Sequence, residues 1–260
     1  MVAGHNPIPP MVPVRIVAAH ELVVDQIRTA ITLGRYGPGD CLPPERALAE
    51  FLNVSRTTVR GAIAILADEG LLEVKRGRGG GLFVRQTAAT HTQTSRAFQQ
   101  NRERIRQVFE FRITVESACA ALAAERRTQS DLREMNRLLK AMTALKGPAN
   151  EVPSHPADTA RFHSLDTDFH LAIAKAARNQ WLLDAVLKGR VEMFRPVGAL
   201  FNVLDVTGDY LHDEIVRAIE LQEPDRASLY MAEHIDTTGH IVESWVSTPD
   251  RRTSKTRTRT

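Results

Sequence analysis

The sequence has few cysteines and no long apolar runs. Its 260 residues include two cysteines, Cys41 and Cys119, which form no CxxC motif. Two isolated cysteines supply neither a disulfide framework nor a cysteine-rich metal site, which favours a reduced, cytoplasmic protein. Uninterrupted apolar stretches such as 118–124 are far shorter than the ~18–20 residues of a membrane span. The proline-rich N-terminus lacks a basic start followed by an apolar block, so no signal peptide is expected.

A large excess of one charge is also missing. The net charge of the chain is +3. The tail 250–260 alone has a net charge of +4, from five basic residues and one acid. Residues 1–249 therefore sum to −1. The high pI of 9.1 comes from the tail and gives no evidence for a basic face on the folded part of the chain.

Composition and length predict two folded domains. With 43% hydrophobic residues, the chain is neither disordered nor fibrous, and its length favours two domains over one. The polar, Thr/Gln-rich stretch between Arg85 and Gln100 is almost free of large apolar residues and is the best boundary. We expect a disordered arm at 1–14, a first domain at 15–85, a linker at 86–100, a second domain at 101–247 and a disordered basic tail at 248–260.

The hydrophobic pattern differs before and after this linker. The first part predicts helices at 16–33 and 45–52, a third helix capped by Ser55 and ending at Glu69, and strands at 71–74 and 82–84. The second part has no convincing strand and predicts helices at about 102–127, 130–146, 158–178, 180–195, 209–222 and 225–246. The expected fold is mainly α, with a small β-wing in the first domain and an all-α antiparallel bundle in the second.

Two short helices followed by a basic hairpin have the layout of a winged helix-turn-helix. In this fold the second helix presents its N-terminal turn to the major groove of DNA. That turn and the next carry Ser55, Arg56, Thr57, Thr58 and Arg60. Hydroxyl and helix-start N–H groups suit phosphate oxygens, whereas guanidinium groups suit guanine. A plain capped helix with a solvated face is the alternative that this pattern leaves open.

Four polar residues of the second part are predicted to face the interior of the bundle. Asp166 and His170 are four residues apart on one helix, while His212 and His234 lie on two later helices among apolar neighbours. Imidazole and carboxylate groups that converge inside a bundle form a divalent metal site. Interior histidines that are only hydrogen-bonded are the alternative. His163 is interpreted as out of phase with Asp166 and His170, and is expected to be exposed.

The run PGDCLPPERALAEFLNVSRTTVRGAIAILADEGLLEVKRGRGGGLFV closely resembles the winged helix-turn-helix signature of the GntR family. The resemblance covers about residues 20–85. In that family the DNA contacts come from the arginine of the PPER segment, the start of the recognition helix and the tip of the wing. The resemblance therefore implies that DNA is bound by Arg46, Ser55, Arg56, Thr57, Thr58, Arg60, Arg76 and Gly77.

The segments LDTDFHLAIAKAARNQWL, LHDEIVRAI and LYMAEHI are similar to the FCD effector domain of FadR-like GntR regulators. This similarity covers about residues 100–245. In the metal-binding members an Asp-x-x-x-His pair and two later histidines hold the ion, which implies the ligands Asp166, His170, His212 and His234. Zn²⁺ fits this donor set, and Ni²⁺ and Mn²⁺ remain open.

In this subfamily the ion and nearby polar side chains hold a small organic acid. Arg112, on the first helix of the domain, is the best candidate for binding its carboxylate. Asn179, at the end of the metal-binding helix, is a second candidate. An ion pair between Arg112 and Glu116, four residues later, is the alternative role for this arginine.

The resemblance implies a ligand-responsive transcriptional regulator, most often a repressor, and not an enzyme. Because one recognition helix reads few bases, we expect a homodimer on a palindromic DNA operator, in the cytoplasm at the nucleoid and without a membrane partner. One alternative is a metal-dependent hydrolase with an accessory DNA-binding domain, although neither HExxH nor GxSxG is present. The other is a regulator whose metal is purely structural.

Overall fold

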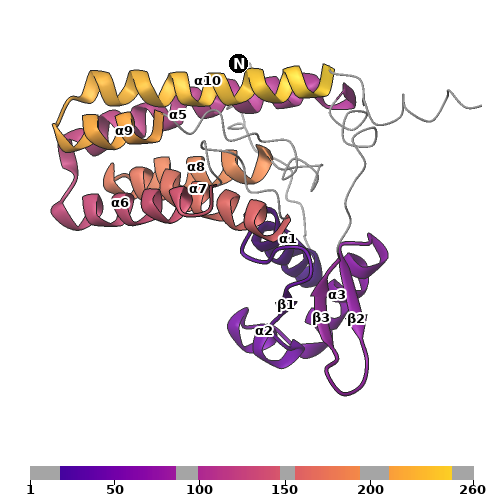
Figure 1. The fold of residues 1–260 in the computed structure, drawn as a ribbon. Coiled ribbons are helices and arrows are strands. Elements are labelled where there is room, and N and C mark those ends of the chain that lie inside the picture. Colours follow the sequence, from indigo (N-terminus) through magenta and orange to yellow (C-terminus); the bar gives the residue numbers. More distant parts are fainter. Residues whose placement is uncertain (1–17, 86–98, 147–155, 194–210, 248–260) are drawn as a thin grey trace, which may run out of the picture.

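The computed structural model describes residues 18–85, 99–146, 156–193 and 211–247. These residues form an N-terminal domain with a small sheet and a C-terminal helical domain (Figure 1). The predicted arm and tail, and residues 86–98 of the predicted linker, lie outside the described residues. Within the described parts of the chain, no helix is long and apolar enough to cross a membrane.

The N-terminal domain is a winged helix-turn-helix. Its helices are α1 (Ala19–Thr32), α2 (Glu45–Phe51) and α3 (Arg56–Asp68), and its strands are β1 (Cys41–Leu42), β2 (Leu72–Lys75) and β3 (Gly81–Val84). The strands are antiparallel in the order β1-β3-β2, with Leu72 opposite Val84 and Leu42 opposite Leu82. The sequence did not predict β1, because two residues between a Gly/Pro-rich turn and a helix carry no alternating pattern. Their pairing with β3 comes from the tertiary structure.

The domain core fixes the orientation of α3. Val59, Ala62 and Leu66 of α3 have no exposed surface and pack in one apolar cluster with Val23 and Ile27 of α1. Removing this apolar surface from water stabilises the pairing of the two helices. As the sequence predicted, Ser55 caps α3, since its Oγ accepts a hydrogen bond from the backbone N–H of Thr58 at 3.0 Å. The polar first turn of α3 is therefore left facing solvent.

The C-terminal domain contains the predicted bundle. Its described helices are α5 (Arg102–Arg126), α6 (Gln129–Thr143), α7 (Pro156–Ala176), α8 (Gln180–Met193), α9 (Leu211–Glu220) and α10 (Pro224–Ser247). The long helices α5 and α10 run side by side and antiparallel (Figure 1). Small side chains permit their close approach: a Cβ on Gly239 would lie 3.2 Å from the ring of Phe109. The four shorter helices α6–α9 complete the bundle, and α7 contacts α5, α6 and α8.

Candidate metal centre and DNA-binding surface

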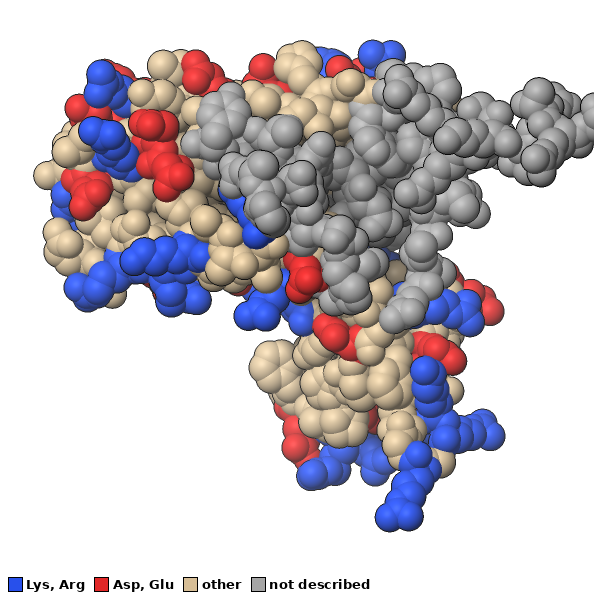
Figure 2. Space-filling view, viewed as in Figure 1, with Lys and Arg blue, Asp and Glu red and all other residues tan. Residues whose placement is uncertain are grey.

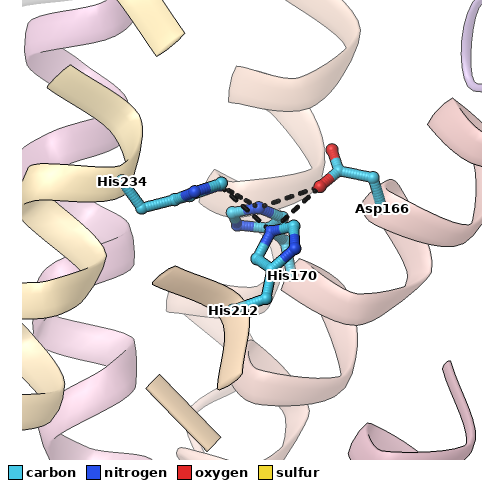
Figure 3. A group of neighbouring side chains, drawn as sticks. All are labelled: Asp166, His170, His212 and His234. Carbon is cyan, nitrogen blue, oxygen red and sulfur yellow. Dashed lines mark hydrogen bonds and ion pairs between the residues drawn. The ribbon is translucent and has the colours of Figure 1, made fainter. Parts of the chain in front are cut away.

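Four side chains from three helices meet inside the C-terminal domain (Figure 3). Asp166 and His170 lie one turn apart on α7, His212 is at the start of α9 and His234 is in the middle of α10. The three histidines are 5% exposed or less. The sequence placed all four side chains toward the interior of the bundle, and the structure brings them together.

The spacing of the ligand atoms fits one metal ion. The Nε2 atoms of His212 and His234 are 3.2 Å apart, and those of His234 and His170 are 3.3 Å apart. Oδ1 of Asp166 lies 3.3 Å from Nε2 of His212 and 3.6 Å from Nε2 of His170. Four ligands held tetrahedrally at about 2.0–2.1 Å from an ion are about 3.3–3.4 Å from one another. All four ligand atoms lie within 4.8 Å of one another, so the group could surround one ion once the more distant atoms move closer together.

A second set of contacts orients His170. Its Nδ1 is hydrogen-bonded to Oε2 of Glu116, and Oε1 of Glu116 accepts a hydrogen bond from Nε of Arg112 at 2.7 Å. An Nδ1–H that donates to this carboxylate leaves the lone pair of Nε2 directed toward the other ligand atoms. Glu116 and Arg112 are each 2% exposed. Glu116 is thus a site residue that the sequence suggested only as an ion-pair partner of Arg112.

Arg190 orients the carboxylate of Asp166. Its Nη2 donates to Oδ2 of Asp166 and, at 3.0 Å, to Oγ1 of Thr167, so Oδ1 is the oxygen that faces the histidines. Arg190 is 1% exposed. Arg190 was not predicted from the sequence as a site residue, although a charged residue at a helix position that faces the core was a usable signal.

The ion pairs keep the carboxylates of Asp166 and Glu116 charged. Burial by itself would raise the pKa of Asp166, but Arg190 and His170 outweigh burial and hold that pKa well below its usual range. Burial likewise opposes ionisation of Glu116, yet Arg112, His170 and Arg190 lower its pKa. Both groups are therefore anionic, the form needed to bind a cation or to accept a hydrogen bond from an imidazole.

The structure corrects the prediction for His163. This residue is 3% exposed, not solvated. Seven residues separate it from His170, which corresponds to almost two full helical turns, so the two side chains lie on the same stripe of α7. The prediction that His163 is out of phase with both Asp166 and His170 was therefore wrong for His170.

The two predicted effector-binding residues lie in different surroundings. Arg112 is buried next to Glu116, the partner of His170, and it also contacts Sδ of Met193 through Nη1 at 2.8 Å. The ion pair with Glu116, which was the alternative role for Arg112, is present. Asn179 lies just before α8, where its Oδ1 accepts hydrogen bonds from the backbone N–H groups of Trp181 and Leu182. Binding of an effector by either residue stays a prediction.

Glu116→Gln tests the role assigned to this carboxylate. The amide keeps the shape but loses the charge that favours Nδ1–H on His170, and loss of such an outer partner costs about 10–100-fold in metal affinity. We expect Zn²⁺ affinity, measured by competition with a chromophoric chelator, to fall by about that factor. Glu134→Gln is the control, since Glu134 pairs with Arg137 on an exposed face of α6. Equal Zn²⁺ affinity in both variants would contradict the assignment.

The predicted DNA-binding residues of the helix-turn-helix lie on one exposed surface. Ser55, Arg56 and Thr57 are exposed at the start of α3, and Ser55 and Thr58 also exchange a hydroxyl hydrogen bond of 2.8 Å. Arg60 donates to Oε2 of Glu45 at 3.0 Å, and this hydrogen bond raises the pKa of Arg60. Arg56 is exposed and, among the described residues, has no ion pair of the kind that joins Arg60 to Glu45. Of the two arginines at the start of α3, Arg56 is therefore the one that can reach a base edge without first breaking an ion pair.

The remaining predicted residues extend this surface on two sides. Arg46 is exposed on α2 and pairs with Glu50. Arg76 and Gly77 are exposed in the loop between β2 and β3, and Figure 2 shows Lys and Arg side chains projecting from this end of the domain. Gly77 has φ +94°, a backbone conformation that favours glycine. The loop thus presents basic groups on a backbone that bulkier residues would strain.

Two known families match separate parts of the chain. Residues 107–237 match the FCD domain, and residues 19–82 match the bacterial regulatory proteins of the gntR family. RmpR of Mycobacterium gastri, named as an HTH-type transcriptional regulator, is 30% identical over 223 residues, 83% of this chain and 77% of that protein. The HTH-type transcriptional repressor NanR of Edwardsiella tarda is 27% identical over 242 residues, 86% of this chain and 84% of that protein.

A solved structure agrees on the fold. The structure of Escherichia coli McbR/YncC is 18% identical and has a TM-score of 0.54, covering 88% of this chain and 99% of that chain. The family matches and the relatives are regulators, so the hydrolase alternative is not favoured. The chain belongs to the gntR family of bacterial regulatory proteins, in the FadR-like subfamily with an FCD domain, and is a transcriptional regulator rather than an enzyme.

Proposed function

We propose that the protein is a homodimeric repressor of transcription whose affinity for a palindromic operator is controlled by a small carboxylate at a metal site. The single observation that carries this proposal is the group Asp166, His170, His212 and His234, whose facing atoms are spaced for one ion inside a regulator's effector domain. A cytoplasmic, nucleoid-associated location follows from DNA binding.

Zn²⁺ is the proposed ion, and Ni²⁺ and Mn²⁺ also suit three imidazoles and one carboxylate. The four side chains would hold it, and Glu116 and Arg190 would keep two of them in position. When bound, the ion supplies a Lewis-acidic position that can accept a carboxylate oxygen. A purely structural ion is the alternative, and the organic-acid test below separates the two.

Buried cationic groups beside the site favour an anionic effector. Arg112 and Arg190 are both 2% exposed or less, and Nε of Arg190 has no hydrogen-bond partner in the described structure. One donor of Arg112 points to a thioether sulfur, which is a weak acceptor. Unsatisfied buried donors are costly, so a carboxylate that accepts hydrogen bonds here would be stabilised. We propose Arg112 as its main protein contact and Asn179 as a second one.

DNA binding is proposed for Arg46, Ser55, Arg56, Thr57, Thr58, Arg60, Arg76 and Gly77. Arg46 and Arg76 would contact phosphates and position the domain, whereas Arg56 and Arg60 would read bases. Two such surfaces in a dimer would contact half-sites on one face of the duplex.

A calorimetric titration of small mono- and dicarboxylates tests the proposal. We expect one acid to bind the Zn²⁺-loaded protein with clearly higher affinity than the others, and to lose most of its affinity after chelation and in Arg112→Ala. Binding of the operator should change the affinity for the acid by the same factor by which the acid changes the affinity for the operator. The control is Arg137→Ala, which removes an exposed arginine of the same domain.

Two results would contradict the proposal. Acid binding that persists at full strength without metal and in Arg112→Ala would place the effector elsewhere. Acid binding that is the same with and without operator would leave the ion with a structural role.

A further inference from the structure

The turn that follows α1 in the DNA-binding domain lies against the metal-ligand helix α7 of the same chain (Figure 1). A Cβ on Gly34 would lie 2.8 Å from the carbonyl oxygen of Ala160 and 3.1 Å from Cβ of Ser164. Gly34 also has φ +71°, which favours glycine where a helix ends. A Cβ on Gly37 would lie 3.3 Å from Cβ of Ala160. The two domains therefore approach to backbone contact here.

An ion pair closes this contact. Arg35 forms a fork with Asp168, in which Nη1 donates to Oδ2 at 2.6 Å and Nη2 donates to Oδ1 at 2.5 Å. Nη1 also lies 3.4 Å from Oγ of Ser164. Such bidentate pairs fix relative orientation as well as distance, and this one raises the pKa of Arg35 chiefly through the hydrogen bonds to Asp168. The side chains are 38% and 33% exposed.

Asp168 stands between two proposed metal ligands on the same helix. It is two residues after Asp166 and two before His170, and at 100° per residue it points about 160° away from each. One face of α7 thus carries the ligand side chains, and the opposite face carries Ala160, Ser164 and Asp168 against the DNA-binding domain. A shift or rotation of α7 that brings its ligands onto an ion must also move Asp168.

The other side of the contact leads to the DNA surface. Arg35 and Gly34 directly follow α1, whose buried residues Ile27 and Ile31 belong to the same apolar cluster as Val59 of α3. Close-packed cores transmit displacement because they tolerate little internal change. Moving the turn therefore moves the first turn of α3.

We propose that Arg35 and Asp168 are positioning residues that couple the metal site of the effector domain to the placement of the DNA-binding domain through α7. This rests on the proposed function and assigns the route by which the site acts on operator affinity. The pair touches neither DNA nor metal, so its removal changes the coupling between the two sites and leaves each site able to bind.

The test measures operator affinity with and without Zn²⁺, using a duplex selected from random DNA by the wild-type protein. For the wild type, chelation is expected to change the operator Kd by roughly 5- to 150-fold, the usual range of coupling between sites. In Arg35→Ala and in Asp168→Ala, the ratio of the operator Kd values without and with Zn²⁺ should fall to within about twofold of one. The double variant should have the same ratio as each single variant, as expected for residues that act as a pair. Zn²⁺ content should stay at the wild-type value in all three.

Arg28→Ala is the matched control, because Arg28 forms a two-oxygen ion pair with Glu69 inside the DNA-binding domain. It should keep the wild-type ratio. A wild-type ratio of one, a wild-type ratio retained in Arg35→Ala, or additive effects in the double variant would overturn the proposal.

Hydrogen exchange tests the contact without either ligand. Replacing Arg35 should speed hydrogen exchange of the α7 peptide 160–168, and replacing Asp168 should speed exchange of residues 31–37. Arg28→Ala should leave the exchange rates of both ranges unchanged. Unchanged exchange would overturn the proposal at the level of the contact itself. Absence of Zn²⁺ or operator binding in the wild type would instead overturn the proposed function, so the two failures are distinguishable.

Discussion

Alanine in place of His170 or His234 is expected to abolish metal binding and with it the stabilisation that metal provides. An ion that binds only the folded state adds about 3–4 kcal/mol to the free energy of unfolding when its free concentration is about 100- to 1,000-fold above its Kd. For a domain of this size that corresponds to about 6–16 °C in Tm. Chelation should lower the Tm of the wild type by that amount and leave the Tm of each variant unchanged.

Comparing Tm with and without chelator within each variant separates metal loss from the packing cost of the substitution. Removing a buried imidazole destabilises the bundle by itself, but that cost is present under both conditions. His240→Ala is the control, because His240 is 73% exposed on α10, where it pairs with Asp236. Metal content by elemental analysis should be one ion per chain in the wild type and in His240→Ala. Full occupancy in the His170/His234 double variant would show that the ligands lie elsewhere.

Arg56→Ala is expected to produce the largest loss of operator affinity among single changes on the DNA surface. A guanidinium that reads guanine contributes about 1–3 kcal/mol of discrimination, so the operator Kd should rise by roughly 5- to 150-fold. Arg60→Ala should act in the same direction with a smaller effect, because Arg60 must first give up its contact with Glu45. Affinity for random DNA should change little in both variants, as measured by fluorescence anisotropy at one fixed salt concentration.

Arg76→Ala provides the contrast within the same surface. If Arg76 contacts a phosphate from the wing, its loss should weaken operator and random DNA alike and reduce the salt dependence of binding. Equal losses on operator and random DNA for Arg56→Ala would refute base reading by this residue and leave it as a phosphate contact.

Local sequence patterns accounted for most helices and for the four clustered polar residues. Apolar spacing along α5 and α10, the serine cap of α3 and the glycines of the wing act through neighbours in the chain, so their consequences can be derived without the fold. The spacing of Asp166 and His170 placed both on one face of a helix for the same reason. The sequence also predicted that Asp166 and His170 lie close to His212 and His234, because side chains that face the interior of a small bundle share a small space.

Contacts between distant segments were decided only by the tertiary structure. Strand β1 exists because β3 passes beside it, and Glu116 and Arg190 became site residues because α5 and α8 bring them to His170 and Asp166. Arg35 and Asp168 are ordinary exposed charges in the sequence, separated by 133 positions. Helical periodicity determines which face of an element is buried, but which partner covers that face depends on the packing of all elements at once. That packing places the DNA-binding domain against the face of α7 opposite Asp166 and His170.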